Sequence, residues 1–334
     1  MNSFLAAFYR TSTDVVVRPT SFDSISSSDR VIQVDACGIC GTDISAILRG
    51  SADYVQVGHE VAGRAISADG SVTDETVVLE SSSACGRCAP CRNARPDLCA
   101  DVKSFFRRPY FGIAERMVSP EISLLPYQGL DPAVACLSEP LGVAIDLCEV
   151  VGITSQSVVL VMGMGPIGLM AVRLAKLAGA KKIYATTFSR REKRNALALE
   201  LGADELLFED ETPLALRKLD PAPDRFLSTT PPTSLTGCVA PAALGAVIGY
   251  IGVGHGETDR MTFSANDFHV KKLQLRASFA APAQRTPLAL ELLHSGRVPG
   301  EKLISHRFPL ADAREAIRVA CHDKDAAIKV VVIP

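Results

Sequence analysis

From about residue 150 onward, short apolar runs alternate with segments that have a helical pattern. The run SVVLVMG at 157–163 is followed by the segment 166–180, in which Ile167, Met170 and Leu174 share one helical face. Further apolar runs occur at 181–187, 204–210, 224–230 and 245–254, and a second helical pattern occupies 190–203. Strands that alternate with helices in this way form a parallel sheet covered on both faces. This half of the chain is therefore expected to be an α/β domain.

The first 150 residues have a different pattern. Short runs rich in Val and Ile, separated by turns, lie at 14–19, 30–38, 59–67 and 75–81. Such runs predict an irregular, mostly antiparallel domain. From about residue 283 the pattern is mixed again, with helical segments at 287–298 and 310–323 and a last strand at 327–334. We expect this tail to pack on the first domain.

Composition narrows the class of protein. The 334 residues suit two domains, and 47% hydrophobic with 22% charged residues is globular composition. A net charge of −2 gives no reason to expect nucleic acid or membrane partners. The N-terminus lacks the basic start of a signal peptide, and the longest apolar run is broken by Gly and Pro. We therefore expect a cytoplasmic protein whose ten cysteines are ligands or core residues.

Four of these cysteines, Cys85, Cys88, Cys91 and Cys99, have the spacing C-x2-C-x2-C-x7-C. Cys-x-x-Cys places two thiolates within reach of one metal ion, and four thiolates fill the tetrahedral coordination sphere of zinc. The spacing therefore predicts a structural zinc site without an open position. Buried free cysteines or an iron–sulfur cluster remain the alternatives, although the spacing is not that of common ferredoxins.

The segment VVLVMGMGPIG contains Gly163, Gly165 and Gly168 in the pattern G-x-G-x-x-G. It follows an expected strand and opens an expected helix, which is the context that dinucleotide binding requires. The three glycines allow a tight turn, a close approach of pyrophosphate and close helix–strand packing, and the helix N-terminus faces the phosphates. With Pro166 and Ile167 between them, they form the predicted dinucleotide-binding loop.

Over nearly its whole length, the chain resembles the zinc-containing medium-chain dehydrogenase/reductase family. The resemblance rests on CGICGTD (37–43), GHEVAG (58–63), the four cysteines, SEPLGVA (138–144), GMGPIG (163–168) and the ending KVVVIP. It implies a GroES-like catalytic domain, residues 1–148 and 283–334 with the zinc lobe at 81–101, and a Rossmann cofactor domain, residues 149–282. It also implies a homodimer or homotetramer.

The same resemblance implies a catalytic zinc held by Cys40, His59 and Glu139, with Glu60 close to the metal. Cys37 is not the matching cysteine, because the family ligand directly precedes GTD. Three protein ligands leave one position for substrate or water. The chain would then carry about two zinc ions.

The resemblance also points to two residues that would bind and transfer the hydroxyl proton of an alcohol substrate. Thr42 resembles the family hydroxyl that hydrogen-bonds the alcohol oxygen, and Ser45 occupies the position of a histidine that ends the proton relay in many relatives. Serine is not a base near neutral pH, so the last proton step is open.

Thr187 ends the second strand of the dinucleotide unit, nineteen residues after Gly168. NAD enzymes place an acidic residue here for the ribose 2′-OH. Thr187 is neutral, and Ser189, Arg190 and Arg191 follow, a hydroxyl and two guanidinium groups that suit a 2′-phosphate. The sequence therefore predicts a preference for NADP over NAD, with use of both cofactors as the main alternative.

Together these features predict a zinc-dependent dehydrogenase that transfers hydride between NADP(H) and a secondary alcohol, giving the ketone. A polyol, sugar or cyclitol is the expected small polar substrate. The alternatives are an NAD-dependent threonine or polyol dehydrogenase and a non-catalytic dinucleotide-binding relative. A nucleic-acid-binding zinc module is less favoured, because only a few arginines on a loop support it.

Overall fold

The computed structural model describes residues 3–67, 70–107 and 109–334. The chain forms two compact units, one of residues 1–142 with 280–334 and one of residues 143–279. The sequence-based boundaries, after 148 and before 283, lie a few residues from these limits. The helix α4 (Ser138–Val151) begins in the first unit and ends in the second.

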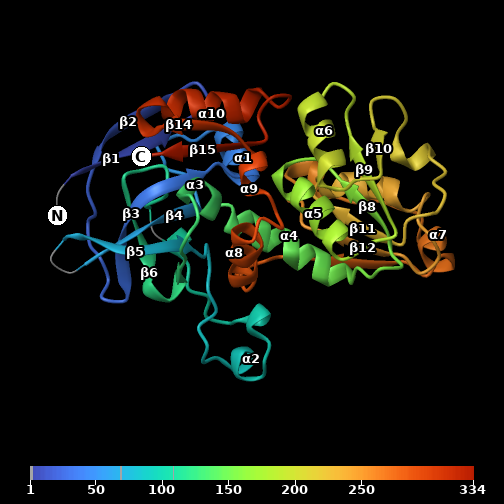
Figure 1. The fold of residues 1–334 in the computed structure, drawn as a ribbon, viewed down its shortest axis with the longest axis horizontal. Helices are drawn as coiled ribbons and strands as arrows, with labels where there is room; N and C mark the ends of the chain where they lie inside the picture. Colours follow the sequence, from blue (N-terminus) through green and yellow to red (C-terminus); the bar gives the residue numbers. More distant parts are fainter. Residues whose placement is uncertain (1–2, 68–69, 108) are drawn as a thin grey trace. The chain divides into compact units, whose positions relative to one another are not determined.

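The first unit is built on a largely antiparallel sheet with the strand order β14-β15-β3-β4-β5-β7, and β6 pairs with β3. The last strand, β15, pairs antiparallel with β3, so the C-terminal tail completes this sheet (Figure 1). The strands are β3 (Asp29–Gly38), β4 (Glu60–Ile66), β5 (Val72–Leu79), β6 (Arg116–Pro120), β7 (Leu124–Pro126), β14 (Ile304–Pro309) and β15 (Lys329–Ile333), and a separate hairpin consists of β1 (Phe4–Tyr9) and β2 (Val15–Thr20).

The first unit also contains short helices, of which α10 packs on β14 and β15. They are α1 (Gly41–Arg49), α2 (Ala89–Arg92), α3 (Pro132–Ala135), α8 (Thr286–His294), α9 (Gly300–Leu303) and α10 (Ala313–His322), with the 3-10 turns η1 (Pro96–Leu98), η2 (Phe105–Arg107), η3 (Glu121–Ser123) and η7 (Leu310–Asp312). A core of aliphatic residues from β3, β4, β15 and α10 holds them together, including Ile32, Val61 and Ile317. The segment that carries α2 projects from the rest of the unit (Figure 1).

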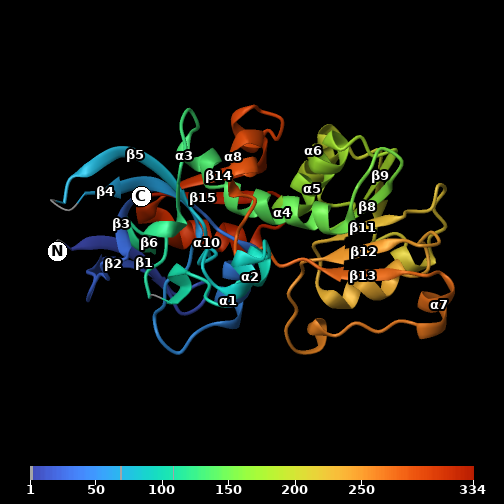
Figure 2. The same cartoon turned by 90° about the horizontal axis from the view of Figure 1, so that it is seen from below.

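The second unit is a parallel sheet with the strand order β10-β9-β8-β11-β12-β13. Numbered within the unit, this is the order 3-2-1-4-5-6 of a Rossmann sheet, and it confirms the predicted cofactor-domain fold. The helices α5 and α6 cover one face (Figure 2). The elements are β8 (Val158–Met162), α5 (Pro166–Leu177), β9 (Lys182–Thr187), α6 (Glu192–Leu201), β10 (Glu205–Phe208), η4 (Leu214–Leu216), β11 (Arg225–Ser228), η5 (Pro232–Cys238), β12 (Val247–Tyr250), η6 (Gly256–Asp259), α7 (Ala265–Val270) and β13 (Gln274–Ala277).

The strand order reverses between β8 and β11, and this switch point is where open α/β sheets bind ligands. The loop after β8 contains the three glycines of the predicted dinucleotide site. Among the described residues, no helix combines the length and the apolar character needed to cross a membrane.

Candidate active site

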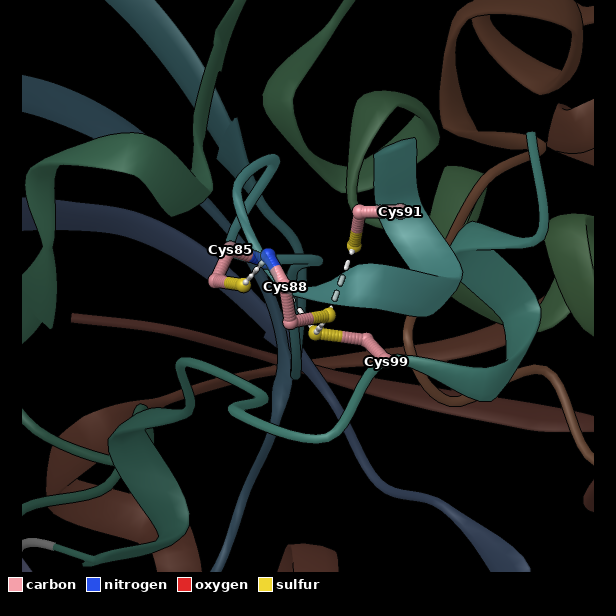
Figure 3. Close-up of side chains that lie close together, drawn as sticks. All are labelled: Cys85, Cys88, Cys91 and Cys99. Carbon is pink, nitrogen blue, oxygen red and sulfur yellow. Dashed lines mark hydrogen bonds between the residues drawn. The ribbon is translucent and has the colours of Figure 1, made fainter. Parts of the chain in front are cut away.

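The four clustered cysteines lie in and around α2 and η1 in the projecting segment of the first unit, and their sulfur atoms face one another (Figure 3). All four sulfurs lie within 4.8 Å of one another, and Cys88 Sγ is 3.4 Å from Cys91 Sγ and 3.8 Å from Cys99 Sγ. Within the described ranges this is the one set of three or more candidate ligands that meets this spacing. The arrangement fits a single tetrahedral ion bound by four thiolates.

The electrostatics of the four-cysteine set also fit a cation. Backbone N–H groups, that of Cys91 foremost, lower the pKa of Cys88 to about 6, whereas desolvation and the neighbouring sulfurs raise the pKa of Cys91 to about 12. One thiol is therefore ready to ionise and another resists ionisation. A zinc ion bound by these four residues would remove this conflict, because a bound cation deprotonates its thiol ligands outright.

Cys40 and His59 come from different segments, and Asp43 ties them together. Cys40 directly precedes α1, and its backbone N–H donates to Asp43 Oδ2 at 3.0 Å. The other oxygen of Asp43 lies 3.2 Å from His59 Nδ1. A carboxylate on one ring nitrogen turns the other nitrogen of a metal-binding histidine toward the ion. The sequence did not indicate a role for Asp43, although it is the last residue of the CGICGTD segment (37–43).

His59 is buried, which opposes its protonation, but the charges of Asp43 and Cys40 outweigh burial and raise its pKa well above the usual value. A thiol and an imidazole in contact are two of the three predicted ligands. The third, Glu139, accepts a hydrogen bond from Ser81 Oγ at 3.3 Å. Part of the Glu139 side chain is exposed, but protein surrounds its carboxylate, and burial raises its pKa.

Cys40, His59 and Glu139 are not among the described sets whose ligand atoms all lie within 4.8 Å. Their role as a catalytic zinc site stays a prediction, and the contact between Cys40 and His59 fits it. Cys37 is fully buried, and burial raises its thiol pKa well above the usual value.

Glu60, expected close to the metal, is fully buried and forms an ion pair with Lys329. The Lys329 ammonium lies 2.6 Å from each oxygen of the Glu60 carboxylate and 3.1 Å from the Ile39 carbonyl oxygen. Lys329 starts β15, so an ion pair between β4 and β15 lies beside His59. The sequence did not indicate Lys329 as part of the site.

The first turns of α1 carry the residues expected to handle the proton. Thr42 is exposed and Ser45 is half-buried. Phe106 in η2 is 51% exposed, and its ring centroid lies 5.4 Å from that of His59. A large apolar surface therefore lies beside the predicted metal ligand, and sequence reasoning missed it.

The three glycines of the loop have the backbone geometry expected for a tight turn, an open approach for pyrophosphate and close helix–strand packing. Gly163 has φ of +87°, and a Cβ at Gly168 would overlap the carbonyl oxygen of Gly163. A Cβ at Gly165 would meet no atom within 4 Å, so the surface above it is open to a pyrophosphate. Pro166 is the first residue of α5, followed by Ile167, and the guanidinium of Arg194 donates to the Met164 carbonyl at 3.0 Å.

The residues predicted to read the adenosine ribose lie at the carboxyl edge of the same sheet. Thr187 is buried, and its hydroxyl donates to Asn195 Oδ1 at 2.7 Å. Arg190 and Arg191 place their guanidinium carbons 5.0 and 4.6 Å from the centroid of the Phe188 ring. Ser189 donates to Asp210, which the sequence did not indicate.

Comparisons with known proteins identify the same two domains. Residues 26–128 match the alcohol dehydrogenase GroES-like domain, and residues 166–295 match the zinc-binding dehydrogenase domain. L-galactonate-5-dehydrogenase of Escherichia coli (strain K12) is 26% identical over 298 residues, 86% of each chain. L-idonate 5-dehydrogenase of Vitis vinifera is 29% identical over 348 residues, 94% of this chain and 90% of that protein.

Among solved structures, a zinc-binding dehydrogenase from Sinorhizobium meliloti 1021 bound to NADP has a TM-score of 0.85 and 25% identity, with 100% of both chains covered. The predicted combination of a GroES-like domain with a Rossmann domain is confirmed, and so is the assignment as a dehydrogenase. The chain therefore belongs to the zinc-containing medium-chain dehydrogenase/reductase family.

Proposed function

We propose that this enzyme oxidises a secondary hydroxyl group of a small polar alcohol to the ketone, with NADP as hydride acceptor and a catalytic zinc held by Cys40, His59 and Glu139. The observation that carries the proposal is the buried link from Cys40 through Asp43 to His59, beside the Glu60–Lys329 ion pair. A metal-binding thiol and imidazole have to be held in a fixed orientation, and this link through Asp43 would do so. An isolated surface thiol would not need it.

Zinc at this site would act as a Lewis acid that lowers the pKa of a bound alcohol. The protein's own part is to hold the ligands and to conduct the proton. Asp43 fixes the orientation of His59, and the exposed hydroxyl of Thr42 is available to hydrogen-bond the alcohol oxygen. Ser45 follows one helical turn later on α1 and can pass a hydrogen bond onward, but it cannot keep a proton near neutral pH. The proton therefore goes on to solvent or to another group.

This assignment of Ser45 has its own test. Ser45→His would supply a base at the end of the relay, and we expect alcohol oxidation near neutral pH to accelerate by about tenfold at most. An unchanged pH–rate profile would remove Ser45 from the proton path.

The cofactor preference rests on the second unit. The strand β9 ends in Thr187 rather than in an acid, and two guanidinium groups follow beside Phe188. A 2′-phosphate is better accommodated by guanidinium groups than by a carboxylate. Arg190→Ala and Arg191→Ala should each raise the KM for NADP several-fold and leave that for NAD nearly unchanged. A wild-type kcat/KM clearly higher with NAD would overturn the preference.

For the substrate we propose a sugar acid, sugar or polyol, because the similar curated enzymes are named for the oxidation of L-galactonate and L-idonate. A panel of aldonates, polyols, sugars and cyclitols, scored by formation of reduced nicotinamide, tests this. A homodimer or homotetramer in the cytoplasm stays a prediction, and sedimentation of the full chain would test the oligomeric part.

The catalytic zinc is tested by Cys40→Ser, with Cys91→Ser as the matched variant at the other site. Each should reduce zinc from about two ions per chain to one. Only Cys40→Ser should abolish turnover while the protein stays folded. Normal turnover in folded Cys40→Ser protein would sink the catalytic-zinc assignment.

A further inference from the structure

Asp210 is the second residue after β10, and it accepts hydrogen bonds from the loop that follows β9. Its Oδ1 accepts a hydrogen bond from the Ser189 backbone N–H at 2.9 Å, and its Oδ2 accepts one from the Ser189 hydroxyl at 2.7 Å. The two strands are parallel neighbours, with Phe208 paired to Thr187, so the loops leave the same edge of the sheet side by side. One exposed carboxylate therefore uses both of the donors that Ser189 offers.

These donors are of the kind that binds phosphate oxygens. A backbone N–H and a hydroxyl beside guanidinium groups form a site for an oxyanion, and here the oxyanion belongs to the protein. The hydrogen bonds from Ser189, aided by the charge of Arg190, keep the pKa of Asp210 below its usual value, so Asp210 is negatively charged at neutral pH.

We propose that Asp210 sets the balance between NADP and NAD by occupying the Ser189 donors and placing a carboxylate where the adenosine 2′ substituent binds. With NADP, the carboxylate competes with the 2′-phosphate for Ser189 and repels it. With NAD, it can accept a hydrogen bond from the ribose 2′-OH, the part that the acid at the end of the second strand plays in NAD enzymes. This inference rests on the proposed use of a nicotinamide dinucleotide at this edge of the sheet.

The neighbouring acids do not share this geometry. Glu209 accepts a hydrogen bond from the backbone N–H of Leu214 at 3.3 Å, away from Ser189. Glu205, at the other end of β10, lies 3.2 Å from Lys182. Glu205→Gln therefore provides a control with the same change of charge at the amino end of the strand, away from the expected cofactor site.

The test measures binding of two fragments to the full-length protein by calorimetry: 2′,5′-ADP, which carries the 2′-phosphate, and 5′-AMP, which does not. Asp210→Asn keeps an acceptor for Ser189 and removes the charge. We expect it to increase the affinity for 2′,5′-ADP relative to 5′-AMP by about five- to tenfold. Glu205→Gln should leave this ratio within about twofold of the wild type. The ratio of kcat/KM for NADP and NAD should move in the same direction.

An Asp210→Asn ratio within about twofold of the wild type, or an equal shift in Glu205→Gln, would overturn the inference. Asp210→Ser supplies a second variant should the asparagine destabilise the loop, with the same expected direction. The proposed cofactor preference fails separately: a wild type that prefers NAD, but shifts toward NADP in Asp210→Asn, refutes the preference and supports the role of Asp210.

Discussion

Replacement of Lys329 by methionine would expose the energetics of the buried ion pair beside His59. Lys329 and Glu60 are 2% and 0% exposed, with 2.6 Å between nitrogen and oxygen. At that distance, an effective dielectric constant of about 20 gives an attraction of about 6 kcal/mol. Desolvation of two charges offsets most of it, so the intact pair contributes little net stability. Removing one partner leaves the other charge buried alone, and we expect Lys329→Met to lose about 3–5 kcal/mol of unfolding free energy.

The assay is urea unfolding at a fixed zinc concentration, followed by far-UV circular dichroism because the chain has no tryptophan. Hydrogen exchange of peptides from β4 and β15 localises the loss, and peptides from the second unit serve as the internal reference. The matched control is Arg318→Met, whose ion pair with Glu315 is about half exposed, with side chains 52% and 48% accessible. Because an exposed ion pair contributes little to stability, that variant should lose far less unfolding free energy than Lys329→Met.

The double variant Lys329→Met with Glu60→Gln separates loss of charge balance from loss of packing. Because it removes both charges, it should recover about 2 kcal/mol or more relative to Lys329→Met alone. The reasoning is refuted if Lys329→Met costs no more than Arg318→Met, or if neutralising Glu60 brings no recovery.

Three further outcomes follow from the same structure. Cys91→Ser should lower both the zinc content and the unfolding temperature, because a closed metal site contributes folding energy; equal unfolding temperatures would contradict this. Asp43→Asn should weaken zinc at the catalytic site by about 10–100-fold in a chelator titration, with the four-cysteine site as internal control. Burial raises the pKa of Glu80 above its reference value of 4.5, although Ser83 donates a hydrogen bond to it. The folded state therefore binds the carboxyl proton of Glu80 more tightly than the unfolded state does. Stability should therefore fall as pH rises from 4.5 through the folded pKa, and Glu80→Gln should flatten that slope in melting temperatures.

The four-cysteine set and the glycine loop could be predicted because their chemistry is local in sequence. Cys85 and Cys88 are three residues apart, and a turn of that length brings thiols together whatever the rest of the chain does. Gly163 and Gly168 belong to one strand–turn–helix unit, whose contacts follow from its backbone. Each pattern therefore carried its own geometry.

The sixth strand of the parallel sheet, β13, was not predicted. Its residues Gln274–Ala277 are mostly exposed and alternate polar with apolar side chains over only four positions. Periodicity over so short a stretch does not separate a strand from a loop. Pairing with β12 at the edge of the sheet, rather than local pattern, makes this segment a strand.

The surroundings of the predicted catalytic ligands could not be predicted, because they depend on contacts between residues far apart in the sequence. Lys329 is 269 residues from Glu60 in sequence, and only the pairing of β15 with β3 and of β3 with β4 brings them together. A lysine at the start of the apolar run KVVVI was the one available signal, since a charge on a buried strand requires a partner. Which acid was the partner could not be read from the pattern. The same sheet that buries Lys329 also fixes the start of β4 next to His59, so Lys329→Met tests the support of the active site as well as the stability of the fold.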